Sequence, residues 1–292
     1  MSEITVAVTQ MACSENIGEN IEKAESLIKQ AAGQGARIIL LQELFLTPYF
    51  CKDEKKEYFE LAREVKNNPV LSRMSELARD LSVVLPVSFY ERAGNVFFNS
   101  IMMIDADGTQ MGVYRKTHIP HAPAYHEKYY FAPGDTGFKV WPTQYGNVGA
   151  GICWDQWFPE CARAMALTGA DILLYPTAIG TSSYDNGYDY SPQWQHVMQG
   201  HAAANTIPVC ASNRVGLEKG ESCELNFFGR SFIADESGTK VAEADRREET
   251  VLTASFDFEE IQKQRDWFAL FRDRRPEMYD VLLTLDGRMS NK

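Results

Sequence analysis

One stretch organises the rest of this chain: Gly149-Ala150-Gly151-Ile152-Cys153-Trp154-Asp155-Gln156-Trp157-Phe158-Pro159-Glu160. Small and apolar residues lead to Cys153, and the proline that follows suits the first turn of a helix. A strand that ends in a cysteine and turns directly into a helix presents the sulfur above the edge of a sheet. The backbone N–H groups of the turn then point at whatever the sulfur attacks. The stretch therefore predicts a strand, a nucleophile elbow at Cys153 and a helix.

Composition and net charge indicate which kinds of molecule this protein is suited to bind. The chain has 292 residues, 45% of them hydrophobic, and a formal net charge of −11. A chain of this length buries roughly three quarters of its unfolded surface, so it supports a large core. The negative charge disfavours nucleic acid and anionic membrane surfaces as partners, and it is compatible with a cationic ligand.

The cysteines and the N-terminal residues indicate the cellular compartment in which the protein is expected. Six cysteines occur at irregular spacing without a Cys-x-x-Cys pair, which is typical of free thiols in a reducing compartment. The first residues include no basic leader, and no apolar segment approaches the length of a membrane span. We therefore expect a cytoplasmic protein without a membrane partner.

Hydrophobic periodicity predicts strands alternating with helices. In the first half, strands are expected over 4–8, 37–41, 83–90, 96–104 and 110–114, and helices over 20–32 and 70–80. In the second half, strands are expected over 148–152, 171–175, 208–212, 227–234 and 239–244, and helices over 160–168 and 194–205. The pairs 83–90 with 96–104 and 227–234 with 239–244 are predicted hairpins.

The two halves share a local pattern. Gly35-Ala36-Arg37-Ile38-Ile39-Leu40-Leu41 resembles Gly169-Ala170-Asp171-Ile172-Leu173-Leu174-Tyr175, because each is a helix end, a Gly-Ala turn and a buried strand. No linker rich in proline, serine or glycine separates the halves. We expect an α/β fold in which two related halves share one core, as a single domain over residues 1–292.

Two further stretches place ionisable residues beside predicted strands. Glu43 directly follows the buried strand 37–41, and Lys116 lies in Tyr114-Arg115-Lys116-Thr117-His118-Ile119-Pro120. Taken alone, each is more typical of a solvated surface. Together with Cys153 they supply what a thiol hydrolase of amides needs. A carboxylate takes the thiol proton, and an ammonium favours the thiolate and stabilises the oxyanion.

These residues resemble the Glu-Lys-Cys triad of the nitrilase (carbon–nitrogen hydrolase) superfamily. Glu43 follows its strand, Lys116 stands in Tyr-Arg-Lys-x-His-Ile-Pro, and Cys153 stands in Gly-x-x-Ile-Cys-Trp-Asp-Gln. The resemblance implies a four-layer α-β-β-α sandwich with no metal or organic cofactor, assembled into a homo-oligomer that is at least a dimer. It also implies that Glu127 is a second carboxylate, which orients Lys116 and the substrate nitrogen.

Residues 127–138, 153–160, 175–180 and 271–276 resemble more narrowly the N-carbamoylputrescine amidases of that superfamily. This resemblance implies hydrolysis of a small cationic carbamoyl amine, N-carbamoylputrescine, to putrescine, carbon dioxide and ammonia in polyamine synthesis from agmatine. In the implied mechanism Glu43 deprotonates Cys153, which attacks the carbamoyl carbon, while Lys116 and the Trp154 N–H hold the oxyanion. Glu43 then protonates the leaving amine and activates water to hydrolyse the carbamoyl enzyme.

Two other hypotheses remain at this point. The chain is alternatively a related amidase acting on another carbamoyl amine or an ω-amide, or a catalytically silent scaffold of the same fold. The presence of Glu43, Lys116 and Cys153 favours an enzyme, because a silent relative has no chemical need for all three.

The residues around the elbow indicate what charge the substrate can carry on the part of the molecule away from the reacting amide, its tail. Asp155, two residues after Cys153, is expected to repel an incoming carboxylate and so to favour a neutral or cationic tail. Trp154 and Tyr49 are also expected to contact the substrate.

The loop 181–190 is acidic and aromatic. Asp185 and Asp189 are candidates to pair with a terminal ammonium lying against a tyrosine ring. A solvated surface loop is the alternative interpretation. Related amidases often carry Ser-Glu after Ala-Ile-Gly, where this chain has Thr181-Ser182, and we expect Asp185 to take over the missing acid's role.

The histidines do not predict a metal site. His196 and His201 are five residues apart on a predicted helix and so do not share a face. His118, His121 and His126 lie in a loop without a matching acid or cysteine pattern.

The C-terminal segment is charged, as in Phe271-Arg272-Asp273-Arg274-Arg275-Pro276. Its composition alone is typical of an exposed tail. The family resemblance implies instead that residues 266–292 pack at a subunit interface.

Overall fold

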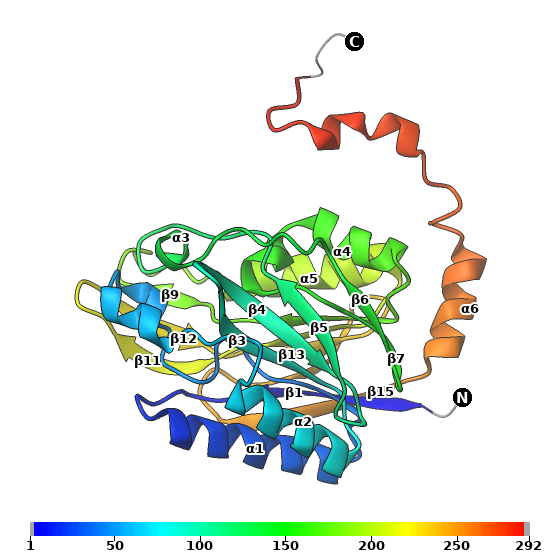
Figure 1. The fold of residues 1–292 in the computed structure, drawn as a ribbon. Helices are drawn as coiled ribbons and strands as arrows, with labels where there is room; N and C mark the ends of the chain where they lie inside the picture. Colours follow the sequence, from blue (N-terminus) through cyan, green and yellow to red (C-terminus); the bar gives the residue numbers. More distant parts are fainter. Residues whose placement is uncertain (1–2, 289–292) are drawn as a thin grey trace.

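Two β-sheets face one another, and helices cover their outer sides (Figure 1). The structure, a computed structural model, describes residues 3–288. The first sheet comprises β15-β1-β2 and β3-β4-β5, which a bridge between Ile38 and Val84 joins. The second sheet has the order β14-β13-β10-β8-β7-β6.

The first sheet is built from β1 (Ile4–Gln10), β2 (Ile38–Leu40), β3 (Leu85–Ala93), β4 (Val96–Ile104), β5 (Gln110–Arg115) and β15 (Thr250–Phe256). The second contains β6 (Val140–Thr143), β7 (Gly146–Ala150), β8 (Ile172–Pro176), β10 (Val209–Ser212), β13 (Phe232–Ala234) and β14 (Lys240–Glu243). A smaller sheet has the order β11 (Val215–Lys219), β12 (Glu224–Phe228), β9 (Gly180–Ser182). The helices are α1 (Ile17–Gly33), α2 (Pro69–Leu81), α3 (Glu127–Tyr130), α4 (Pro159–Leu167), α5 (Ser191–Asn205) and α6 (Phe258–Phe268).

Alternating side chains along the strands create the layers. In β1, Val6 and Val8 belong to the core between the sheets, whereas Ala7 packs in the core beneath α1 and α2. In β8, Leu174 faces the central core and Leu173 packs against α4 and α5. The predicted α-β-β-α sandwich is therefore confirmed.

The repeated Gly-Ala pattern ends a helix in the same way in both halves. Gly35 has φ +91° and Gly169 has φ +99°, conformations that glycine adopts without strain. The next residue's N–H reaches back to the helix in each case, from Ala36 to Ala31 at 3.1 Å and from Ala170 to Met165 at 3.1 Å. The same turn thus delivers β2 and β8 to their sheets.

The strand expected over 227–234 is wrong as a single element. Its start belongs to β12 in the small sheet, and its end is β13 in the second large sheet. Gly229 and Arg230, with φ values of +59° and +57°, break the strand between them. The predicted pairing with 239–244 survives only for β13 with β14.

The chain beyond α6 leaves the sandwich and extends away from it (Figure 1). Leu283 and Leu285 in this segment are 88% and 107% exposed. Residues 289–292 of the segment predicted at a subunit interface lie outside the described residues. Across residues 3–288, no helix combines the length and apolar character needed to cross a bilayer.

Candidate active site

Three of the predicted site residues follow strands and meet inside the fold. Glu43 lies in the loop after β2, Lys116 directly follows β5, and Cys153 opens the 3₁₀ turn η3 (Cys153–Trp157) after β7. The Lys116 Nζ donates to Glu43 Oε1 at 2.8 Å, and both side chains are fully buried. Cys153 is also buried, and the charges of Glu43 and Lys116 both act on its thiol. The structure therefore places the three side chains in one buried cluster that draws on both sheets.

Glu127, the first residue of α3, completes this cluster. Lys116 Nζ donates to its Oε1 at 2.9 Å and to its Oε2 at 2.7 Å. The Tyr49 hydroxyl donates to Glu127 Oε1 at 2.7 Å. Tyr49, expected to bind substrate, is fully buried behind Glu127 and holds that carboxylate in place.

The cluster contains two carboxylates and one ammonium with no access to water. Burial disfavours the Lys116 ammonium, but Glu127 and Glu43 outweigh this effect and raise the pKa of Lys116 well above its ordinary value. Burial raises the pKa of Glu127 to about 7, against the opposing attraction of Lys116. Lys116 is therefore a permanent cation, and Glu127 titrates near neutral pH.

The thiol of Cys153 is protonated in the resting site. Burial and the charge of Glu43 raise its pKa well above the ordinary value, and Lys116 opposes them only in part. Lys116 thus favours the thiolate, as expected, but burial and Glu43 outweigh it in the resting site. Deprotonation has to accompany attack, and Glu43 Oε2 suits that step because it is buried without a hydrogen-bond partner among the described residues.

The elbow at Cys153 is a strained turn that Asp155 holds from inside. Cys153 has φ +42°, in the left-handed region that residues with a side chain rarely occupy. Asp155 Oδ2 accepts from the Ile152 N–H at 2.9 Å and from the Tyr114 hydroxyl at 2.7 Å. Its Oδ1 accepts from the His118 N–H at 3.0 Å. Asp155 is buried and is not among the described residues that line the cavity beside Cys153, so its observed role is to hold the elbow.

A cavity of about 470 Å³ opens onto Cys153. Trp154, 39% exposed, lies in its wall as expected. Its aromatic lining also includes Tyr125, Trp157, Tyr184 and Tyr190. Among the described residues that line it, Asp185 is the only acid, and none is a lysine or an arginine. The cavity thus combines a nucleophile, aromatic walls and a single negative charge.

Comparison with known proteins assigns this chain to a family. The sequence profile described as carbon–nitrogen hydrolase matches residues 5–266. The chain belongs to the carbon–nitrogen hydrolase family. It is accordingly a hydrolase that acts on amides.

Individual relatives of this carbon–nitrogen hydrolase match along nearly its whole length. It is 53% identical over 294 residues to an N-carbamoylputrescine amidase from Oryza sativa subsp. japonica, covering 99% of this chain and 97% of the relative. It is 55% identical over 283 residues to a protein named citrullinase from Francisella tularensis subsp. tularensis, covering 97% and 99%. The crystal structure of a carbon–nitrogen hydrolase from Helicobacter pylori G27 superposes with a TM-score of 0.91 at 38% identity, covering 97% of this chain and 99% of that one.

The two acids proposed for the substrate's tail lie in different places in this hydrolase. Asp185 is in the cavity wall, where its Oδ2 accepts from the Ser182 N–H at 2.5 Å and hydroxyl at 2.9 Å. Asp189 is absent from the described lining, and its carboxylate pairs with Arg246 at 2.6 Å. The structure therefore brings only Asp185 to the cavity that holds Cys153.

Two residues that hold Glu43 in position were not predicted from the sequence. Asn99 Nδ2 donates to Glu43 Oε1 at 2.6 Å, and the Arg214 Nη2 donates to the backbone oxygens of Glu43 at 3.0 Å and Leu44 at 2.6 Å. Arg214 is fully buried and is paired with Glu218 at 3.0 Å. An arginine just after the predicted strand 208–212 was the available signal, but its partners lie far away in the sequence.

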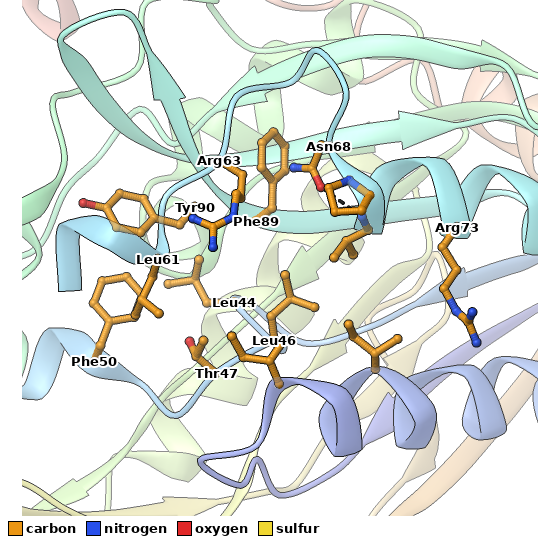
Figure 2. Close-up of a pocket in the computed structure, with 14 residues that line it drawn as sticks. Leu44, Leu46, Thr47, Phe50, Leu61, Arg63, Asn68, Arg73, Phe89 and Tyr90 are labelled. Carbon is orange, nitrogen blue, oxygen red and sulfur yellow. Dashed lines mark hydrogen bonds between the residues drawn. The ribbon is translucent and has the colours of Figure 1, made fainter. Parts of the chain in front are cut away.

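A second cavity, of about 300 Å³, lies beside the loop that carries Glu43. Figure 2 shows its mainly apolar walls, with Leu44 and Leu46 pointing into the space near Phe89. Arg63 and Arg73 contribute its charges, and no cysteine, histidine or acid is among its described lining residues. This cavity therefore lacks the groups for amide hydrolysis that the cluster at Cys153 has.

Proposed function

We propose that this enzyme hydrolyses N-carbamoylputrescine to putrescine, carbon dioxide and ammonia. The observation that carries the proposal is the cavity at Cys153, whose one acid, Asp185, stands among aromatic side chains with no lysine or arginine in its described lining. A carbamoyl group on a four-carbon chain with a terminal ammonium matches this arrangement in charge and in apolar character. The N-carbamoylputrescine amidase relatives support the same substrate.

Citrulline is the second candidate, because a relative named citrullinase is 55% identical to this chain. Citrulline carries the same carbamoyl group on a tail with both an α-amino group and an α-carboxylate. Burying that carboxylate near Asp185 without a cationic partner costs free energy. The described lining of the cavity therefore favours the diamine derivative.

Acylation begins from a neutral thiol. As Cys153 Sγ bonds to the carbamoyl carbon, its proton passes to Glu43 and negative charge moves onto the carbonyl oxygen. The Lys116 ammonium and the Trp154 N–H, in the first turn of η3, stabilise that oxygen. The carbon–nitrogen bond then breaks, and Glu43 returns the proton to the leaving amine.

Deacylation uses the same groups in reverse. Glu43 takes a proton from water, which attacks the carbon bonded to Cys153, and the thiolate leaves and is reprotonated. The second amine and carbon dioxide are released when the resulting carbamate or carbamic acid decomposes. Glu127 keeps Lys116 oriented throughout, because both of its oxygens accept from Nζ.

A substrate panel tests this function. The purified protein is given N-carbamoylputrescine, citrulline, N-carbamoyl-β-alanine and a simple ω-amide, and ammonia release is measured, with Cys153→Ser as the inactive control. We expect the highest kcat/KM for N-carbamoylputrescine. A higher kcat/KM for citrulline would assign the enzyme to the second candidate, and no turnover of any of the four would reject both.

The setting of the reaction is part of the same proposal. We infer that the enzyme acts in putrescine synthesis in the cytoplasm, which the six free cysteines support because free thiols persist in reducing compartments. We also infer a single domain over 1–292 and a homo-oligomer that is at least a dimer. The exposed leucines of the C-terminal segment, Leu282, Leu283 and Leu285, support packing of residues 266–292 against another subunit.

A further inference from the structure

Two histidines are brought together by a short hairpin at the rim of the catalytic cavity. Ala122 and Tyr125 exchange backbone hydrogen bonds of 3.0 and 2.8 Å. Residues that flank such a pair in antiparallel chains lie opposite one another, with their side chains close. His121 and His126 are the flanking residues, and their ring centroids are 5.5 Å apart.

Glu54 reaches the same place from the segment after η1 (Phe50–Lys52). Its Oε1 lies 3.3 Å from His126 Nδ1. The His126 N–H donates to the Cys51 oxygen at 2.7 Å, which ties the hairpin to η1 itself, just before Glu54 in the chain. One ligand atom from each of Glu54, His121 and His126 lies within 4.8 Å of the other two.

Within the described part of the chain, the Nδ1 of His126 has one polar neighbour, Glu54 Oε1 at 3.3 Å, and the geometry of that contact is not a hydrogen bond. This nitrogen is buried and makes no hydrogen bond among the described residues. A buried polar atom in that state costs free energy, which a bound cation would recover. Glu54 and His121 are exposed, so their side chains are free to rotate toward a shared ion.

We propose that Glu54, His121 and His126 form a binding site for a divalent transition-metal ion, with Zn²⁺ the best match, at the rim of the catalytic cavity. Two imidazoles and one carboxylate are a common zinc ligand set, and they leave a fourth position for water. Mg²⁺ and Ca²⁺ prefer oxygen ligands only, so a site with two imidazole nitrogens is a poor match for either ion. The sequence offered no sign of this site, because Glu54 is far from both histidines along the chain.

Metal binding would affect the catalytic cavity directly. His121 is part of the cavity wall, and His126 immediately precedes Glu127. A bound dication adds positive charge to a cavity whose described lining has no lysine or arginine. Zinc is therefore expected to oppose entry of a cationic substrate and to raise its KM. This consequence rests on the proposed substrate, whereas metal binding itself does not.

Equilibrium dialysis against zinc chloride tests the site without the catalytic thiol. The Cys153→Ser protein is expected to bind one Zn²⁺ per chain that is lost, or weakened at least about tenfold, on adding Glu54→Gln or His126→Asn. His196→Asn is the matched control, because His196 is an exposed histidine on α5 outside the cluster. Equal zinc binding by all of these variants, or no binding by the Cys153→Ser protein, would overturn the proposal.

Kinetics test the effect on catalysis separately. Zinc is expected to raise the KM for N-carbamoylputrescine in the wild-type enzyme, reversibly with EDTA, and to have little effect on Glu54→Gln. Equal inhibition of both proteins would show that zinc acts elsewhere, such as at Cys153, and would reject the role at the rim. If N-carbamoylputrescine is not hydrolysed at all, the substrate assignment fails while the dialysis result still decides the metal site.

Discussion

Asp185→Asn is expected to weaken recognition of the substrate's ammonium and leave the chemistry at Cys153 intact. In the wild type, the Asp185 Oδ2 accepts from the Ser182 N–H at 2.5 Å. Asparagine keeps an oxygen that can accept this hydrogen bond, so the turn of the loop is preserved. What is lost is the negative charge. Hydrogen bonds to charged groups contribute about 1.5–3 kcal/mol. Because Asp185 is partly exposed, solvent screening favours the lower end of that range, which corresponds to roughly a tenfold loss of kcat/KM.

The assay compares two substrates and two variants. N-carbamoylputrescine carries the ammonium, whereas butylurea has the same carbamoyl group and four-carbon chain without it. Asp185→Asn is expected to lower kcat/KM for the first substrate and to leave the second nearly unchanged. Asp189→Asn is the matched control, because Asp189 pairs with Arg246 outside the described cavity lining. The reasoning is refuted if Asp185→Asn leaves N-carbamoylputrescine hydrolysis unchanged, or if both substrates lose activity equally.

Three other substitutions test the buried cluster and its supports. Burial raises the pKa of Glu127 from 4.5 to about 7, so its ionisation costs the folded state up to about 3 kcal/mol as pH rises through that window. Glu127→Gln removes this cost, so its Tm relative to wild type is expected to rise between pH 4.5 and about pH 7 and to level off above; a constant difference would contradict the shift. In Gly134→Ala the new Cβ would clash most closely with the Arg115 backbone oxygen and also meet the Lys116 oxygen at 2.7 Å. We expect about 1–3 kcal/mol lower stability in urea together with reduced kcat. If Gly134→Ala has wild-type stability and wild-type kcat, the backbone at that position can shift to make room for the Cβ, and the prediction is wrong. Arg214→Met withdraws the donor that holds the Glu43 oxygen at 3.0 Å, and we expect it to cost about 3–5 kcal/mol of stability; an unchanged urea midpoint would argue against that support.

Most of the helices and strands could be predicted from local patterns in the sequence. Val6, Ala7 and Val8 form a continuous apolar run that predicts a strand buried on both faces, and each face does meet a different apolar layer. The elbow was also predictable, because a cysteine between a small-residue strand and a proline-led helix leaves few other conformations. By contrast, the break at Gly229 depends on where β12 and β13 find their partners, which no local pattern specifies.

The environment of the site could not be predicted from local patterns. Whether Asp155 faces the cavity or the interior is decided by Tyr114 and His118, which come from another strand end. The protonation of the Cys153 thiol depends on how completely the fold excludes water, which the residue types alone do not reveal. Glu54 comes near His121 and His126 because the hairpin is tied to η1, which lies just before Glu54 in the chain.

The most direct test of the account is the mass of the Cys153 peptide after rapid acid quenching during turnover of N-carbamoylputrescine. We expect a transient increase equal to one carbamoyl group on Cys153, absent from the other cysteines and absent when Glu43→Gln replaces the base. Turnover without any adduct on Cys153, or an adduct on a different residue, would contradict the claim that this buried thiol is the nucleophile.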